Sequence, residues 1–141
     1  MTRISWDEHF MELARFVADR STCLKAQHGA VLVIDKRVLA MGFNGAPEGF
    51  EHCVICRRVG LPSGEHPEWC RATHAEQNAI INAARVGIST VGSVIYITGR
   101  PCVLCTKMLI NAGIILIVYP DGRISPVDLF QKYDRELEFK E

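Results

Sequence analysis

The sequence is best understood from Thr73-His74-Ala75-Glu76 and, after 24 intervening residues, Pro101-Cys102-Val103-Leu104-Cys105. Each of these segments opens a stretch with helical spacing, and the apolar run Ser93–Thr98 between them is typical of a strand. The pattern therefore predicts a helix, a strand and a second helix in that order. We expect both helix starts to lie beyond strand ends, where open α/β sheets bind their ligands.

One imidazole and two thiolates form a ligand set that suits Zn²⁺, and three protein ligands leave a fourth position for water, as in catalytic zinc sites. Zinc lowers the pKa of such a water from about 15.7 to about 7, which makes hydroxide available near neutral pH. We therefore expect His74, Cys102 and Cys105 to hold a catalytic zinc. Pro101 is expected at the first position of its helix, which would place both cysteines in the opening turn, where the helix dipole favours thiolate.

Glu76 is the candidate for the group that moves protons during the reaction. It lies two residues after His74, about 200° around a helix, so wheel geometry disfavours it as a metal ligand. A second interpretation is that Thr73 and Glu76 form a capping box, which requires no catalysis. The two interpretations are compatible if Glu76 caps its helix while the pocket is empty.

Length and composition predict one globular domain that spans residues 1–141. Basic and acidic residues number 16 each, and this balance argues against a broad surface for nucleic acid or membrane. No apolar run approaches 18 residues, and the first residues turn polar at once, so neither a membrane span nor a signal peptide is expected. Six cysteines in such a chain indicate thiols or metal ligands in the cytoplasm and not disulfides.

The remaining patterns predict a three-layer α/β/α sandwich with a mixed five-stranded sheet. Apolar and turn patterns predict helices over 6–19, 73–85, 102–111 and 126–134, and strands over 30–34, 37–41, 93–98, 114–119 and 137–139. The first two strands are apolar almost throughout, so both faces are expected to be covered. The strand, helix and strand from Ser93 to Tyr119 predict parallel pairing through a crossover. The long segment from Gly42 to Arg71 is expected to be functional or tied down.

From about Trp6 to Tyr119 the chain resembles the deoxycytidylate (dCMP) deaminase family of the cytidine deaminase-like superfamily. The arrangement H-x-E followed by P-C-x-x-C is a known signature of zinc deaminases that act on nucleobases. The residues that carry the resemblance are Ser21–Cys23, Gly29–Val31, Gly42–Pro47, His74–Ile80 and Pro101–Cys105.

The resemblance implies a hydrolase that converts dCMP to dUMP and ammonia and so supplies dUMP for thymidylate synthesis. It implies catalytic zinc on His74, Cys102 and Cys105, with Glu76 as proton shuttle. It also implies substrate contacts from Asn44 to the deoxyribose, from Lys25 to the phosphate, and from Ala75. A surface lysine is an equally good interpretation of Lys25, and turn chemistry alone would explain Asn44. Relatives are often homohexamers that dCTP activates and dTTP inhibits.

Several members of the family also carry a second, structural zinc that holds the long segment. A closed site needs four ligands, and the favoured set here is Cys23, Cys53, His66 and Cys70. Cys56 is the alternative to His66 as the fourth ligand. The competing interpretation is that these are free buried thiols and histidines of a loop.

Other functions remain open at this stage. The substrate could be another cytosine nucleotide, since no residue excludes a triphosphate, or adenosine or cytidine in RNA, which the neutral charge disfavours. A non-catalytic zinc module is also conceivable, with Cys53, Cys56, Cys102 and Cys105 as one four-thiol site. The 45 residues between those pairs exceed the usual ribbon spacing, and this module leaves His74 and Glu76 unexplained.

Overall fold

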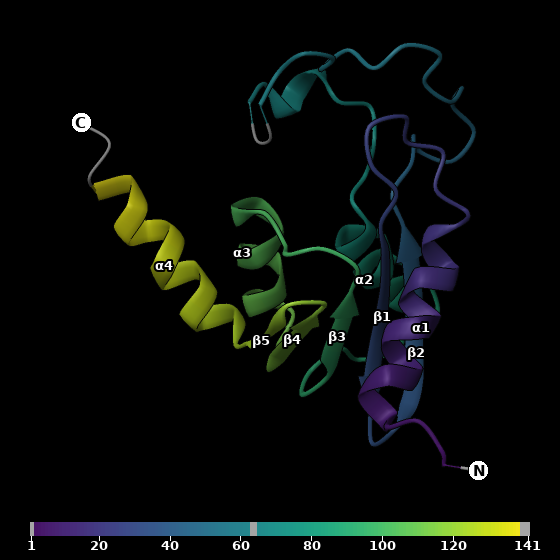
Figure 1. Ribbon diagram of the computed structural model, residues 1–141, viewed down its shortest axis with the longest axis vertical. Helices are drawn as coiled ribbons and strands as arrows, with labels where there is room; N and C mark the ends of the chain where they lie inside the picture. Colours follow the sequence, from purple (N-terminus) through teal and green to yellow (C-terminus); the bar gives the residue numbers. More distant parts are fainter. Residues whose placement is uncertain (1, 63–64, 139–141) are drawn as a thin grey trace.

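The computed structural model describes residues 2–62 and 65–138 and contains a five-stranded sheet with helices on both faces (Figure 1). The sheet order is β2-β1-β3-β4-β5, in which β3 and β4 are parallel and the other neighbours are antiparallel. The expected α/β sandwich with a mixed five-stranded sheet is therefore confirmed. The elements are α1 (Trp6–Ala18), β1 (Gly29–Ile34), β2 (Arg37–Phe43), the 3₁₀ helix η1 (Pro67–Trp69), α2 (Ala75–Arg85), β3 (Val94–Ile97), α3 (Val103–Asn111), β4 (Leu116–Tyr119), β5 (Gly122–Ile124) and α4 (Pro126–Glu138).

Two apolar layers hold the helices to the sheet. Alternate residues of β1 point to opposite faces, so Val31 and Val33 pack under α1 while Ala30 and Leu32 pack under α2. Helices α2 and α3 share the second face, and α4 packs on α3 and projects away from the sheet in Figure 1. Within the described residues, no helix is both long enough and apolar enough to cross a membrane.

Two glycines allow the helices to approach the sheet closely. A Cβ atom on Gly42 in β2 would lie 2.4 Å from the backbone nitrogen of Ala79 in α2. A Cβ atom on Gly29 in β1 would lie 2.1 Å from the carbonyl oxygen of Ala14 in α1. Because α2 rests directly on the backbone of β2, its first turn is fixed against the end of the sheet.

The C-terminal region differs from the sequence prediction. The fifth strand is β5, which follows the two-residue turn Pro120-Asp121 after β4 and pairs with β4. The strand expected over 137–139 is wrong, because Leu137 and Glu138 continue α4, and Phe139 lies outside the described residues. The spacing of Leu129, Tyr133 and Leu137 at four-residue intervals extends one helical face past Asp134, where the predicted helix ended.

The prediction that both faces of β2 are covered was also wrong. This strand lies at the edge of the sheet, and Val38 and Met41 are more than two-fifths exposed. Its neighbour β1 is buried along almost its whole length, as expected. The two strands have similar apolar composition, so their place in the sheet and not their residues decides their burial.

Candidate functional site

The starts of α2 and α3 bring His74, Cys102 and Cys105 together. His74 Nδ1 lies 3.2 Å from Cys105 Sγ and 3.7 Å from Cys102 Sγ. One ligand atom from each of the three residues lies within 4.8 Å of the other two. Among the described residues, no other set of three or more histidine, cysteine or acidic side chains lies this close together. An imidazole and two thiols at this spacing fit a tetrahedral Zn²⁺ with one open position.

Both helix starts are capped differently from the sequence prediction. His74 is the N-cap of α2, and its backbone N–H donates to Gln77 Oε1 at 2.8 Å. Thr73 lies one position before the N-cap, and its backbone pairs with Gly45 across the end of the sheet. The capping box of Thr73 and Glu76 is therefore wrong, and Glu76 is not occupied with capping.

Cys102 is likewise the N-cap of α3 and not a residue of its first turn, so Pro101 precedes the helix and does not open it. Cys102 Sγ accepts from the backbone N–H of Cys105 at 3.5 Å, as an N-cap side chain does. The cap role turns this sulfur back over the helix start and toward His74. Tyr133 of α4 supports the same segment, because its hydroxyl donates to the Pro101 carbonyl at 2.6 Å.

Glu76 occupies the second position of α2 and is only 6% exposed. Burial raises the pKa of its carboxyl above the ordinary value, against the opposing effect of His74 nearby. A carboxyl with a raised pKa that faces a ligand cavity can both accept and return a proton near neutral pH. Glu76 lines the same cavity as His74 and Cys102, two of the three metal-ligand candidates.

The Cys102 sulfur is electrostatically prepared for a cation. Hydrogen bonding from the Cys105 side chain, aided by His74, lowers the pKa of the Cys102 thiol to about 4. The same contact raises the pKa of the Cys105 thiol, and the hydrogen bond to Cys102 raises the pKa of His74. A thiolate at Cys102 is the form that binds metal.

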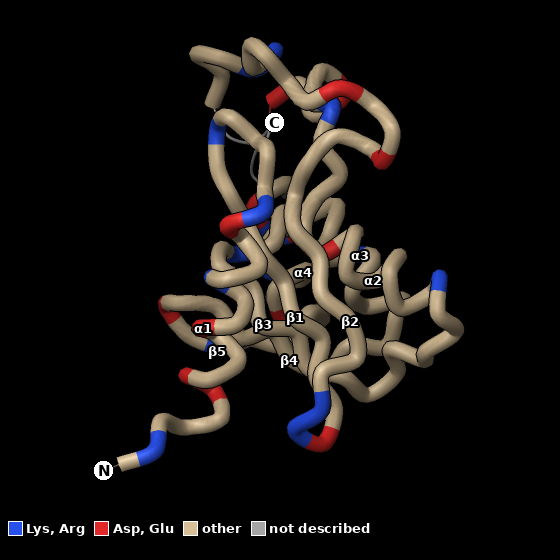
Figure 2. The backbone as a smooth tube through the Cα atoms, turned by 90° about the vertical axis from the view of Figure 1, so that its right-hand side faces the viewer, with Lys and Arg blue, Asp and Glu red and all other residues tan. Residues whose placement is uncertain are grey.

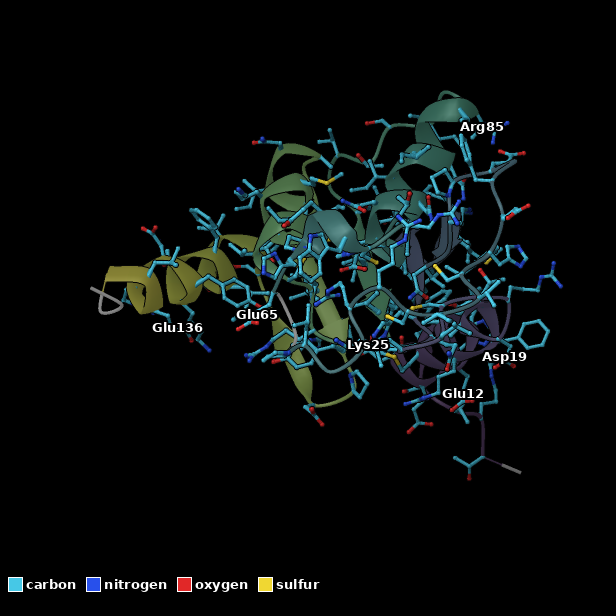
Figure 3. All side chains as sticks on the ribbon, turned by 90° about the horizontal axis from the view of Figure 1, so that it is seen from above. Glu12, Asp19, Lys25, Glu65, Arg85 and Glu136 are labelled. Carbon is cyan, nitrogen blue, oxygen red and sulfur yellow. The ribbon has the colours of Figure 1, made fainter. Side chains whose placement is uncertain are left out.

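A cavity of about 220 Å³ opens over this site. Its wall includes three cationic side chains, from Lys25, Arg58 and Arg100, and also Ala75 and Glu76. Lys25 Nζ donates to the Leu61 carbonyl at 3.1 Å, so the segment before β1 contacts the long segment. Lys25 and Glu65 are labelled in the view from above in Figure 3. The cavity thus combines a metal-binding end with positive charge, which suits a phosphorylated substrate.

Asn44 also lines the cavity, where its side chain is held by several partners. Asn44 Oδ1 accepts from Ser21 Oγ at 2.6 Å and from the His28 backbone N–H at 2.8 Å, while Nδ2 donates to the Ala26 carbonyl at 2.8 Å. Among the described residues the second hydrogen of Nδ2 has no acceptor, so it can bond a ligand. The Asn-Gly turn signal found in the sequence therefore accompanies a rigidly oriented amide.

Among the polar side chains of the cavity wall, three were not assigned a role from the sequence, namely those of His28, Arg58 and Arg100. Arg58 lies in the long segment and donates from Nε to the Glu65 carbonyl at 2.9 Å. Arg100 directly precedes Pro101, which was the only available hint of its position. Nothing in the local sequence distinguishes these cations from solvated surface residues.

The second group of thiols lies beside the first cavity. Cys23, Cys53, Cys56 and Cys70 all line a smaller cavity of about 20 Å³, and three of them, Cys23, Cys56 and Cys70, also line the larger one. His66 is not among the lining residues, because its ring stacks on Trp69 at 3.9 Å and its Nδ1 lies 3.0 Å from Glu68 Oε1.

Comparison with known proteins identifies the family. Residues 4–120 match the family described as the cytidine and deoxycytidylate deaminase zinc-binding region. The chain is 38% identical to the deoxycytidylate deaminase of Mycobacterium phage D29 over 130 residues, which cover 85% of this chain and 98% of that protein. It is 40% identical to ComE operon protein 2 of Bacillus subtilis over 121 residues, 86% of this chain, but spans only 62% of the length of that relative.

A solved structure shows the same fold. The dCMP deaminase of the cyanophage S-TIM5, in complex with dCMP and dUMP, superposes with a TM-score of 0.73 at 28% identity, covering 94% of each chain. The match of 117 residues, 4 to 120, extends over most of the chain and includes every residue of the metal-ligand group. The chain belongs to the cytidine and deoxycytidylate deaminase family.

Proposed function

We propose that this chain is a single deaminase domain that hydrolyses dCMP to dUMP and ammonia, the reaction that supplies dUMP for thymidylate synthesis. The observation that carries the proposal is the convergence of His74, Cys102 and Cys105 beside the buried Glu76, in a cavity that also bears cationic side chains. The names of the phage relatives, which the chain matches over most of their length, support dCMP as the substrate.

In this proposal, His74, Cys102 and Cys105 hold the catalytic zinc. Bound Zn²⁺ supplies Lewis acidity that makes water a nucleophile near neutral pH. As the water oxygen bonds to C4, the Glu76 carboxylate takes a proton from it and delivers that proton to ring nitrogen N3. Glu76 then moves the remaining proton of the C4 hydroxyl to the exocyclic amine, so that the C4–N bond breaks, the C4 carbonyl forms and ammonia leaves.

Other cavity residues orient the nucleotide. Ala75 is the first residue of α2, and helix geometry leaves its N–H without an intrahelical acceptor, so this donor suits the base carbonyl. The free Nδ2 hydrogen of Asn44 suits a deoxyribose oxygen. Lys25, aided by Arg58 and Arg100, binds the phosphate, which replaces the Leu61 carbonyl as the acceptor of Lys25.

Ammonia release from cytidine, deoxycytidine, dCMP and dCTP tests the substrate assignment, with dCMP expected to react fastest. The substitution Lys25→Ala is expected to raise the KM for dCMP with little change for deoxycytidine, since only dCMP carries the phosphate. The exposed Lys132→Ala serves as a charge-matched control away from the cavity. Equal effects of Lys25→Ala on both substrates would remove Lys25 from the phosphate site.

We also propose a structural zinc on the second group of thiols, with Cys56 as the fourth ligand beside Cys23, Cys53 and Cys70. The support is that these four residues line one small cavity, whereas His66 is engaged by Trp69 and Glu68. Four thiols match the ligand number of a closed zinc site. Metal analysis of fully loaded protein is expected to give about two zinc ions per chain, and one per chain would exclude the second site.

Self-association as a homohexamer, with dCTP as activator and dTTP as inhibitor, completes the proposal. Large apolar side chains are exposed on α1 and on the long segment, and contiguous apolar surface is typical of interfaces. Light scattering of the protein with and without each nucleotide tests both the assembly and the effectors. The six unpaired cysteines favour a reducing compartment, for which we propose the cytoplasm.

Two competing functions are separated by simple assays. Deamination of dCTP at the dCMP rate would favour a different cytosine nucleotide, because the cavity cations do not limit the number of phosphates. An RNA substrate would require a basic face, and Figure 2 instead shows acidic and basic positions interspersed along the backbone. A non-catalytic zinc module predicts no ammonia release from any of these substrates.

A further inference from the structure

His28 is a cavity residue for which the deaminase chemistry above has no role. It directly precedes β1 and lines the same cavity as His74 and Glu76. Its backbone N–H donates to Asn44 Oδ1 at 2.8 Å, and its Nδ1 lies 3.0 Å from Thr98 Oγ1. The ring also occupies the space beside Gly99, where a Cβ atom would lie 2.8 Å from His28 Cε1. The imidazole is therefore held in one orientation from several sides.

The hydrogen bonds around Thr98 decide which ring nitrogen carries the proton. Thr98 Oγ1 already accepts from the Gly29 backbone N–H at 3.2 Å, and its other partner among the described residues is His28 Nδ1. The hydroxyl hydrogen of Thr98 is therefore best donated to Nδ1, which makes Nδ1 an acceptor and leaves the proton on Nε2. Burial, and then the nearby His74, lowers the pKa of His28, so the ring is neutral at neutral pH.

The second ring nitrogen of His28, Nε2, is available for a ligand. Within the part of the chain that the structure describes, Nε2 of His28 has no hydrogen-bond partner. A neutral N–H donor suits an uncharged oxygen acceptor, whereas the cavity cations suit phosphate. Asn44, bonded to the His28 backbone, is proposed to contact the deoxyribose, which places the imidazole beside the nucleoside part of the substrate.

We propose that His28 is a substrate-binding residue whose Nε2–H donates a hydrogen bond to an uncharged oxygen of the nucleoside part, the base carbonyl or a deoxyribose oxygen. This inference rests on the proposed cytosine deaminase function of the same cavity. It distinguishes His28 from Lys25, because a contact to the nucleoside serves substrates with and without phosphate alike.

The first experiment compares kcat/KM for dCMP and deoxycytidine in the zinc-loaded wild type, His28→Leu, His28→Gln and Lys25→Ala. Loss of one neutral hydrogen bond is expected to lower both values about 3- to 10-fold in His28→Leu. His28→Gln keeps an N–H donor at a similar reach and is expected to stay within about twofold of wild type. Lys25→Ala is expected to affect dCMP alone.

The outcomes separate the two proposals. If wild type deaminates neither substrate, the proposed function fails. If wild type is active but His28→Leu changes neither value, or changes that for dCMP alone, the role of His28 is wrong while the proposed function stands.

A second measurement needs no substitution of His28. Two-bond ¹⁵N–¹H correlation spectra of the zinc-loaded protein report the tautomer of each neutral imidazole, and the Nε2–H form is expected for His28. Thr98→Val should allow a mixture of tautomers, whereas Thr98→Ser keeps the hydroxyl and should keep the Nε2–H form. An Nδ1–H tautomer in the wild type would overturn the inference.

Discussion

The two groups of cysteines in this molecule differ in what holds them. Cys102 and Cys105 lie at the start of α3, which is anchored in the core by the fully buried Leu109. Cys23, Cys53, Cys56 and Cys70 lie in connecting segments, outside the α-helices and strands. The first pair meets His74 within metal-binding distance, whereas the second group shares a cavity but, among the described residues, forms no donor cluster that tight.

This difference shows what packed elements contribute to a metal site. Burial of apolar surface by α2 and α3 fixes the ligands in place before any ion binds, so catalytic geometry is a property of the fold. In the long segment, little apolar burial is available to hold the thiols, so the proposed structural zinc would itself supply the ordering free energy. The predictions that follow test this contrast, beginning with the largest expected effect.

Removal of the Glu76 carboxylate tests whether the packed site is catalytic. Glu76→Gln is expected to lower kcat by about 10²- to 10⁴-fold, because it removes the proton carrier without touching a ligand. Steady-state ammonia release measures the loss, and zinc content should equal that of wild type. Glu12→Gln, on the exposed face of α1, is the matched control. Loss of zinc together with activity would make Glu76 a structural residue.

Removal of one thiol from the long segment tests whether a metal orders it. Cys56→Ser is expected to abolish binding of one zinc and to lower the free energy of unfolding by more than about 4 kcal/mol, as losses of structural metals do. Zinc analysis and thermal unfolding measure both effects. His66→Ala, which removes a ring stacked on Trp69, should retain that zinc. The reverse pattern would restore His66 as the fourth ligand.

The close contact beneath α2 tests the importance of packing at the first site. Gly42→Ala places a methyl group 2.4 Å from the Ala79 backbone nitrogen, and this overpacking is expected to cost about 1–3 kcal/mol of stability. Gly45→Ala, whose methyl group would meet only Thr22 Oγ1 at 3.1 Å, is expected to cost less than about 1 kcal/mol. Denaturant unfolding compares the two, and equal costs would contradict the packing argument.

The smallest effect is expected at Tyr133, which joins α4 to the ligand segment. Tyr133→Phe removes the bond to the Pro101 carbonyl and is expected to lower stability by about 1 kcal/mol at pH 7. Burial raises the folded-state pKa of Tyr133, so its contribution is complete below the unfolded value of about 10 and is lost as pH rises beyond it. Chemical unfolding of both proteins from pH 7 to 11 should therefore show a difference that shrinks above pH 10.

The elements around the site were predictable because their signals are local. Apolar periodicity located α1, α2 and α3, and the run before Pro101 located β3. The exact helix boundaries were harder to predict from the sequence. Thr73 has the residue type of an N-cap, but its backbone pairs with Gly45 and the helix begins one residue later. The strand expected at 137–139 failed because Leu137 and Glu138 continue α4. Strand β5 was missed because its three residues are too few for a periodic signal.

The sequence by itself determined the α/β class, the family resemblance and the metal-ligand residues, because each depends on residue types at short, characteristic spacings. Only the tertiary structure decided which other side chains join them. His28, Arg58 and Arg100 come from segments far apart in the chain, and no local pattern records that they line one cavity. The physical reason is that a ligand cavity is formed by long-range packing of the sheet and helices, which bring together residues whose own neighbours in sequence give no sign of it.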